Sequence, residues 1–192
     1  MKPHVIVIAG PNGAGKSTAA PVILRDYLGL TDYVNADLIA QGLSAFASET
    51  VAFEAGRIML KRLRDLAARR CDFAFETTLA TRSYAPWLTG LRETGYQVKL
   101  IFLWLPSPEA AVARVAERVR LGGHSVPEEV VRRRYRRGLH NFLHVYRQLA
   151  DEWWLYDNSG PDGAVRVVFG TQAKVNGVTD QNTWRLILEN PP

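Results

Sequence analysis

The residues with the clearest chemical signature form a glycine-rich loop directly after an apolar run at 5–9. The phosphate-loop pattern G-x-x-x-x-G-K-[ST], extended by one residue, is matched by Gly10, Pro11, Asn12, Gly13, Ala14, Gly15, Lys16, Ser17 and Thr18. Such glycines let backbone N–H groups point at a β-phosphate, and the next helix N-terminus adds partial positive charge. Lys16, expected on an exposed loop, can then reach the β- and γ-phosphates, while Ser17 can ligate Mg²⁺. The loop therefore predicts binding of a nucleoside triphosphate, ATP, together with Mg²⁺.

Two carboxylates stand at the ends of predicted strands, Asp37 in Val34-Asn35-Ala36-Asp37 and Glu76 after Phe73-Ala74-Phe75. In a parallel sheet the carboxyl ends of the strands share one edge with the phosphate loop, so both should face the γ-phosphate. A carboxylate there can accept the proton of an attacking hydroxyl or help to hold Mg²⁺. The alternative is structural: Asp37 caps the next helix and Glu76 pairs with a surface arginine. The pair, placed after a phosphate loop, favours a kinase.

Arginines are concentrated in one part of the chain, where nine of the nineteen fall between Arg114 and Arg147. Arg118 and Arg120 precede Gly122-Gly123, and five more lie at 132–137. A glycine hinge between two arginine-bearing helices predicts a lid over 118–137 that brings cations onto the transferred phosphoryl group. Neighbouring helical positions are ~100° apart, so the five cannot all face one ligand. We expect about two to act, and the others to be solvated or paired with glutamates at 128–129.

Three smaller features have competing interpretations. His140 and His144 lie one helical turn apart, a spacing that can chelate a metal, but a helix-face pair is favoured because the metalloprotease glutamate is absent. Trp153 and Trp154 are expected in core and rim packing and not in base stacking. Asn158, in the polar loop Asp157-Asn158-Ser159-Gly160, either contacts the adenine or belongs to a turn.

These residues must be positioned by alternating strands and helices, which predict an α/β domain around a parallel sheet. Strands are expected at 5–9, 32–35, 72–76, 98–105, 153–156 and 165–169, with 98–105 central because it is the most apolar. Helices are expected at 16–27, 37–43, 49–70, 84–94, 108–121, 128–150 and 181–188. Ser125 and Glu128 have the spacing of a capping box for the helix that starts at 128.

Composition limits the class of protein. The 192 residues suit one domain, and a single cysteine, Cys71, excludes an intramolecular disulfide and a cysteine-based zinc site. Cys71 is interpreted as a small core residue. The chain shows neither a signal-peptide pattern nor an apolar run near the ~20 residues of a membrane helix, so a cytoplasmic location is expected. The net charge of +5 fits either nucleic-acid binding or the phosphates of a bound nucleotide.

Taken together, these segments resemble the zeta-toxin family of P-loop kinases over nearly the full chain, as a compact member. The matching segments are 10–18, 35–37, 75–79, 118–127 with Arg133-Arg134, and 156–159. The resemblance implies a three-layer P-loop NTPase fold like that of small-metabolite and nucleoside kinases. It also implies transfer of the ATP γ-phosphate to a hydroxyl of a UDP-activated amino sugar such as UDP-N-acetylglucosamine.

The resemblance further assigns roles to single residues. Asp37 resembles the general base, Lys16 and Ser17 the phosphate and Mg²⁺ ligands, and Arg118 with Arg133 or Arg134 the transition-state clamps. The substrate-side set is Asp37, Glu76, Thr77, Arg82, Arg120 and Arg133. An antitoxin protein is the candidate macromolecular partner that the family implies.

The leading prediction is an ATP-dependent kinase whose acceptor is an alcohol group of a small molecule. A polynucleotide or tRNA kinase is the alternative enzyme, supported by a sequence pI of about 9.6 but without a recognition module or a basic aromatic platform. A nucleotide-gated switch without transfer is the third hypothesis. Neither nucleic acid nor a membrane is expected as a partner in the leading prediction.

Overall fold

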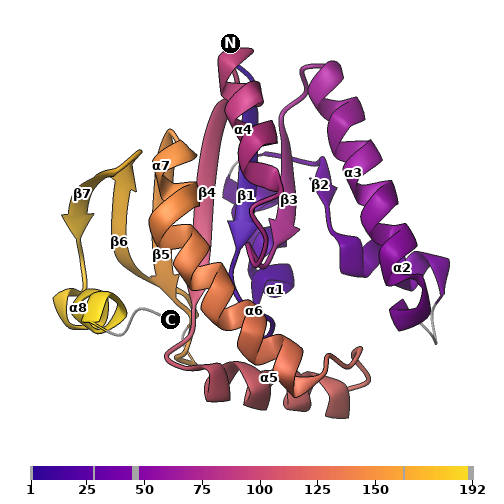
Figure 1. Cartoon of the computed structure of the whole chain (residues 1–192), viewed down its shortest axis with the longest axis vertical. Helices are drawn as coiled ribbons and strands as arrows, with labels where there is room; N and C mark the ends of the chain where they lie inside the picture. Colours follow the sequence, from indigo (N-terminus) through magenta and orange to yellow (C-terminus); the bar gives the residue numbers. More distant parts are fainter. Residues whose placement is uncertain (1, 28, 45–47, 162, 190–192) are drawn as a thin grey trace.

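The computed structural model describes all residues except 1, 28, 45–47, 162 and 190–192 (Figure 1). Its centre is a seven-stranded sheet with the order β2-β3-β1-β4-β5-β6-β7. Neighbours from β2 to β5 pair in parallel, whereas β5, β6 and β7 pair antiparallel. The strands are β1 (His4–Ala9), β2 (Tyr33–Val34), β3 (Phe73–Thr77), β4 (Gln97–Trp104), β5 (Glu152–Asp157), β6 (Val165–Thr171) and β7 (Lys174–Val178). The predicted α/β fold with a mainly parallel sheet is confirmed.

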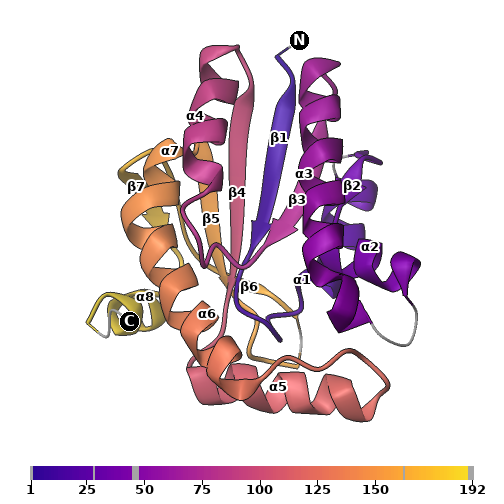
Figure 2. The same ribbon diagram turned by 45° about the vertical axis from the view of Figure 1, so that its right-hand side comes forward.

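Helices connect these strands and carry the predicted lid. They are α1 (Lys16–Pro21), α2 (Ala36–Leu43), α3 (Ala52–Ala68), α4 (Tyr84–Glu93), α5 (Pro108–Arg120), α6 (Glu128–Asn141), α7 (Arg147–Leu149) and α8 (Gln181–Glu189). A 3-10 turn, η2 (Ser48–Val51), precedes α3. In Figures 1 and 2, α4, α6 and α7 cover one face of the sheet and α5 crosses the foot of the molecule, and Figure 2 shows α3 running in front of β3 and β2. The predicted lid is therefore the end of α5, the following loop and the first part of α6.

The core is centred on β4, as the apolar run predicted. This strand lies between β1 and β5, and its residues from 100 to 104 are all buried. Phe102 packs its ring 4.6 Å from that of Phe142, and Phe142 meets Trp153 edge-on at 5.9 Å. Trp153 is buried and Trp154 half-buried, so the expected core and rim packing is confirmed. Cys71 is also half-buried and packs against this core.

Two predicted helices are not regular throughout. After α1 the chain becomes π-helical over η1 (Val22–Tyr27), immediately past Pro21, which has no N–H to donate to the preceding turn. The helix predicted at 128–150 likewise passes through a π-helical segment, η3 (Phe142–Tyr146), before α7. The segments are helical as expected, but their hydrogen-bond register changes within them.

One local prediction is wrong, and one strand was not predicted. The N-cap of α6 is Pro127, with no side-chain capping hydrogen bond, so Ser125 and Glu128 do not form a capping box. Ser125 lies two residues too early, and Glu128 instead accepts from Arg132 one turn later. The antiparallel edge strand β7 was not predicted, because its exposed, mixed sequence Lys-Val-Asn-Gly-Val lacks a buried apolar face.

Candidate active site

The phosphate loop is a tightly confined turn between β1 and α1. Gly10, Gly13 and Gly15 all adopt positive φ, at 143°, 80° and 77°, which favours glycine. A Cβ added at Gly13 would lie 2.9 Å from the carbonyl oxygen of Ala111, and one at Gly15 would lie 2.6 Å from Asn158 Nδ2. The loop is thus held between α5 and the segment after β5, with no room for side chains at these glycines.

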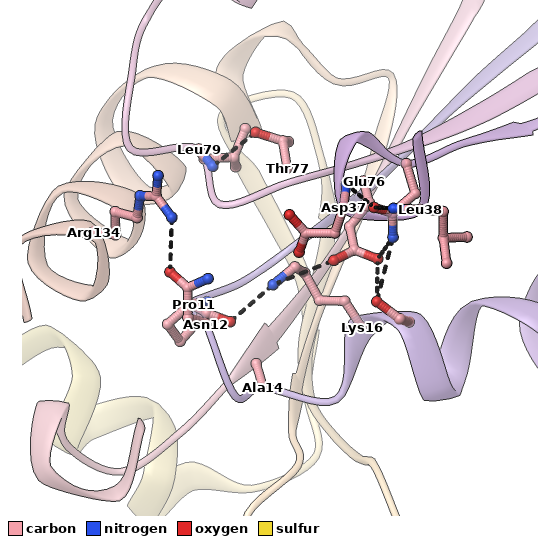
Figure 3. A network of polar contacts seen from close by, with 12 residues as sticks. Pro11, Asn12, Ala14, Lys16, Asp37, Leu38, Glu76, Thr77, Leu79 and Arg134 are labelled. Carbon is pink, nitrogen blue, oxygen red and sulfur yellow. Dashed lines mark hydrogen bonds and ion pairs between the residues drawn. The ribbon is translucent and has the colours of Figure 1, made fainter. Parts of the chain in front are cut away.

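Lys16 is buried inside this loop, with 6% of its side chain exposed, so the expectation of an exposed lysine is wrong. Its Nζ donates to the carbonyl oxygen of Pro11 at 2.8 Å and lies 3.7 Å from Glu76 Oε1 (Figure 3). Burial lowers the pKa of Lys16, and the carboxylate of Glu76 opposes that shift. The ammonium therefore sits at the centre of the loop, where a phosphate would replace the Pro11 carbonyl as its partner.

Glu76, at the carboxyl end of β3, is the acceptor at the centre of the network. Its Oε2 accepts hydrogen bonds from Ser17 Oγ at 2.9 Å, Tyr33 Oη at 2.6 Å and Asn35 Nδ2 at 2.8 Å. Burial and the neighbouring carboxylate raise the pKa of Tyr33, so its hydroxyl remains a donor. The alternative in which Glu76 pairs with a surface arginine is wrong, because four groups around the phosphate loop already surround it.

Asp37 lies in the first turn of α2 but does not cap that helix. The cap is Asn35, whose Oδ1 accepts from the backbone N–H groups of Asp37 at 2.7 Å and Leu38 at 3.3 Å. The capping alternative for Asp37 is therefore wrong. Its carboxylate, 48% exposed, lines a cavity of about 280 Å³ together with Lys16 and Glu76. A candidate base and the phosphate-loop lysine thus share one cavity.

The lid contributes two arginines and a histidine beside Asp37. Arg134 of α6 lines the same cavity, and its Nη1 donates to Asn12 Oδ1 at 3.4 Å (Figure 3). Arg118 of α5 donates from Nη2 to the backbone oxygen of His124 at 3.0 Å. His124 Nε2 in turn lies 3.7 Å from Asp37 Oδ2. The end of α5 therefore contacts α2 through the lid loop.

A second cavity, of about 470 Å³, adjoins the first and shares Ala80 and Thr81 with it. Its remaining lining residues are Arg82, Arg136, Arg137, His140 and Asn141. Arg82 Nε donates to Asn141 Oδ1 at 3.2 Å, and Asn141 Nδ2 donates to the oxygen of Leu79 at 2.7 Å. This second cavity is hereafter called the arginine pocket.

The wall of the arginine pocket is fixed to α6. A Cβ at Gly138 would overlap the carbonyl oxygen of Thr78, so α6 touches the loop after β3 directly. Tyr146 donates to the oxygen of Thr81 at 2.7 Å, and the backbone N–H of Leu79 donates to Thr77 Oγ1 at 3.1 Å. Leu79 adopts a positive φ of 53° and is fully buried. The loop from Thr77 to Arg82 is therefore held in one conformation.

Comparison with known proteins gives this arrangement a family. The sequence model of the family described as Zeta toxin matches residues 1–160. The chain belongs to the zeta toxin family. An uncharacterized protein of Haemophilus influenzae is 28% identical over 137 residues, which are 70% of this chain and 94% of that protein.

Two solved structures illustrate the fold that this chain shares with known proteins. The AvrRxo1-ORF1:AvrRxo1-ORF2 structure with sulphate ions has a TM-score of 0.76 at 18% identity, covering 96% of this zeta toxin family chain and 63% of its own. A structure of the PezAT toxin-antitoxin system of Streptococcus pneumoniae has a TM-score of 0.64 at 16% identity, covering 96% and 77%. The P-loop kinase fold is shared with both.

Two arginines expected on the substrate side of this zeta toxin family protein lie elsewhere. Arg120 is two positions from Arg118, about 200° around α5, and pairs with Glu117 on the surface with 75% of its side chain exposed. Arg133 is exposed and is absent from the lining of both cavities, since the next position, Arg134, takes the inward direction. As expected for surplus arginines, Arg132 pairs with Glu128, and it also pairs with Glu109.

Asn158 of the zeta toxin family chain ties the phosphate loop to the end of β5. Its Nδ2 donates to the oxygen of Ala14 at 2.8 Å, and Arg114 donates to the neighbouring Ser159 oxygen at 2.9 Å. Sequence reasoning gave no role to Arg114, Tyr33 or His124. The sequence signal for Tyr33 was its place in a short predicted strand. The signal for Arg114 was its place on the helix that faces the phosphate loop.

The residues fit ATP and Mg²⁺ by the chemistry of their donors. Within the described part of the chain, no three His, Cys, Asp or Glu side chains gather to form a metal site by themselves. Mg²⁺, however, is commonly held by one or two protein ligands together with substrate phosphates. Ser17 Oγ, with Glu76 beside it, would hold such an ion, which would neutralise charge on the β- and γ-phosphates.

His140 and His144 lie on the same helical face. The rings of His140 and His144 lie 4.6 Å apart on α6 and η3, which is the helix-face pair expected. Of the helices in the described residues, none combines the length and apolar character that crossing a bilayer requires.

Proposed function

We propose that this chain transfers the γ-phosphate of ATP to a hydroxyl of a small anionic metabolite. The observation that carries the proposal is the single cavity that contains both Lys16 of the phosphate loop and the non-capping carboxylate of Asp37. A nucleotide-gated switch needs the loop and uses a carboxylate only to hold Mg²⁺, whereas phosphate transfer to a hydroxyl also uses one as a base. The same cavity contains Arg134, a cation for the charge on the transferred group.

In the proposed reaction, the acceptor hydroxyl gives its proton to Asp37 as its oxygen bonds to the γ-phosphorus. The bond between that phosphorus and the β–γ bridging oxygen breaks, and ADP leaves. Negative charge spreads over the transferred oxygens, and Lys16, Arg118 and Arg134 stabilise it. Glu76 keeps Lys16 charged and holds Ser17 in place.

The arginine pocket supports an acceptor that carries negative charge. Its lining includes Arg82, Arg136 and Arg137 but no carboxylate. Within the described residues, neither Arg136 nor Arg137 forms an ion pair, whereas Arg132 on the same helix forms two. A guanidinium fork is well matched to phosphate oxygens. A UDP-activated amino sugar, with its hydroxyl at Asp37 and its diphosphate toward the arginine pocket, is therefore the acceptor we propose first.

The antitoxin remains part of the proposal. One structural neighbour comes from the PezAT toxin-antitoxin system and another is an AvrRxo1-ORF1:-ORF2 complex, which motivates a search for a protein partner. A cytoplasmic location, where ATP is available, is proposed with it and is supported by the single cysteine.

The test incubates purified protein with ATP, Mg²⁺ and UDP-N-acetylglucosamine, and in parallel with a metabolite extract and with an RNA oligonucleotide bearing a free 5′-hydroxyl. Mass spectrometry should find one added phosphate on the sugar nucleotide or on another anionic metabolite, and none with Lys16→Ala. Phosphate on the RNA alone would favour the polynucleotide kinase instead. If no acceptor gains phosphate while ATP still binds, the kinase proposal is overturned in favour of a switch.

A further inference from the structure

The lid loop folds back onto the helix that precedes it. Gly122 has a φ of 87°, its N–H donates to the Val119 oxygen at 3.0 Å, and the N–H of Gly123 donates to the Arg118 oxygen at 2.9 Å. This hydrogen-bond pair is the Schellman motif that ends many helices. A Cβ at Gly123 would lie 2.6 Å from Arg118 Cγ, so only glycine leaves room for that side chain. The turn therefore carries His124 back over Arg118.

One nitrogen of His124 faces two residues with opposite requirements. Nε2 lies 3.4 Å from Arg118 Nη2 and 3.7 Å from Asp37 Oδ2. A guanidinium has only donors, so it requires the lone pair of Nε2, whereas a carboxylate has only acceptors and requires a proton there. Nε2 can therefore serve only one of them at a time. His124 is 18% exposed, so few other partners reach the ring.

Other charges around this group come from three elements. Lys16 of α1 and Arg134 of α6 both act on Asp37, and Arg118 acts on Lys16. Arg118 itself is only partly satisfied, because its Nε is buried and has no hydrogen-bond partner among the residues that the structure describes. The guanidinium is held by a ring nitrogen and a backbone oxygen, and a γ-phosphate would offer it charged oxygens, which accept stronger hydrogen bonds.

We propose that His124 is a positioning residue whose Nε2 changes its hydrogen-bond partner from Arg118 to Asp37 when ATP binds. The γ-phosphate draws Arg118 away and frees the Nε2 lone pair. The ring then changes tautomer, its proton passing from Nδ1 to Nε2 through water, with no net proton uptake. Nε2–H donates to Asp37 Oδ2, which leaves Oδ1 directed at the acceptor hydroxyl. The base is thereby oriented only after the nucleotide has arrived.

The exchange can be observed without catalysis, by nitrogen-15 NMR of the histidine rings. The chain has four histidines, and His124→Gln identifies the signal of His124 by its loss. Without nucleotide, Nε2 should appear unprotonated; with the β,γ-imido analogue of ATP and Mg²⁺, it should appear protonated. ADP, which lacks the γ-phosphate, should leave the ring unchanged. An unchanged tautomer with the saturating analogue, or the same change with ADP, would overturn the proposal.

The kinetic consequence rests on the proposed function and separates positioning from a structural role. His124→Leu should lower kcat by about 10-fold to 100-fold while the KM for ATP changes less than about threefold, because orientation of the base is lost and the loop is not. His124→Gln, which offers both a donor and an acceptor near the Nε2 position, should restore most of kcat. A raised KM for ATP with unchanged kcat in His124→Leu would contradict the exchange. If the wild-type protein phosphorylates no acceptor, the proposed function is wrong. The NMR experiment still tests whether His124 changes its hydrogen-bond partner, because it does not depend on catalysis.

Discussion

Lys16 Nζ and Glu76 Oε1 lie 3.7 Å apart, and both side chains are buried at the base of the phosphate loop. This pair joins the loop after β1 to the end of β3, two segments that the parallel register brings together at Ala9 and Thr77. The other oxygen of Glu76 is occupied by three donors. One carboxylate thus ties the phosphate loop to the ends of β2 and β3.

Glu76→Gln should therefore destabilise the protein as well as inactivate it. A neutral amide leaves the Lys16 ammonium without its counter-charge, and removing one member of a buried pair costs about 3 kcal/mol of unfolding free energy. Denaturant titration measures this, with Glu129→Gln at the exposed start of α6 as the control, expected within about 0.5 kcal/mol of wild type. Equal stabilities of the two variants would contradict a structural role for the pair.

Asp37→Asn should leave the fold intact and stop phosphate transfer. Asn35 already caps α2, so the melting temperature and ATP affinity should match wild type, while transfer falls by about 10²-fold or more because an amide cannot take a proton. Asn35→Ala is the matched comparison, expected to cost more than about 1 kcal/mol, because it loses both the cap and the hydrogen bond to Glu76. Wild-type-like phosphorylation by Asp37→Asn would end the general-base assignment and leave Glu76 as the next candidate.

Arg118→Ala and Arg120→Ala should differ strongly although they lie two residues apart. Arg118 points to the lid loop beside Asp37, while Arg120 pairs with Glu117 on the surface. We expect kcat to fall by about 10²-fold for Arg118→Ala, with less change in ATP binding, and to be unaltered for Arg120→Ala. If Arg118→Ala and Arg134→Ala both keep wild-type kcat, the lid does not supply the transition-state cations.

Arg82→Ala and Arg137→Ala should raise the KM for the acceptor by about tenfold or more, because each removes hydrogen bonds to a charged group. The KM for ATP should stay the same, since the arginine pocket lies beyond Ala80 and Thr81 from the phosphate loop. Arg132→Ala serves as the control, because Arg132 is already paired with Glu109 and Glu128. An unchanged acceptor KM in both variants would place the acceptor's negative charge elsewhere.

Tyr146→Phe should cost about 1 kcal/mol of stability at neutral pH, through the lost hydrogen bond to Thr81. Burial raises the pKa of Tyr146 to about 12 from its ordinary value of 10.0. The unfolded chain therefore loses this proton first, and the unfolding free energy should fall between pH 10 and about pH 12. Denaturation across that range should show a shallower decline in Tyr146→Phe, and identical slopes would contradict the shift.

The sequence was sufficient to predict the motifs whose chemistry requires a fixed spacing and the strands that are buried on both faces. The phosphate loop follows from its glycines and lysine, and β1 and β4 follow from uninterrupted apolar runs. The choice between Asn35 and Asp37 as the cap of α2 could not be predicted, because both side chains cap helices and lie two residues apart. The burial of Lys16 was missed because it depends on Glu76, sixty positions away in the chain.

For the lid residues as well, the sequence predicts one property and leaves another open. A run of arginines predicts a cationic face, but the inward member is set by the rotation of α6 against its neighbours, which brings Arg134 inside and leaves Arg133 exposed. β7 was not predicted, because this exposed edge strand lacks the alternating apolar residues by which a strand is recognised in a sequence.

The contact between Gly138 and the Thr78 oxygen restricts which part of the lid can move. With no side chain between them, we expect α6 and the loop after β3 to move as one unit, so that Arg134 and the arginine pocket keep a constant separation when a nucleotide binds. Opening and closing are then left to the short segment from Arg118 to Pro127, which is hinged at Gly122. On this expectation, only the turn between α5 and α6 moves, and the proposed acceptor side has its shape before ATP binds.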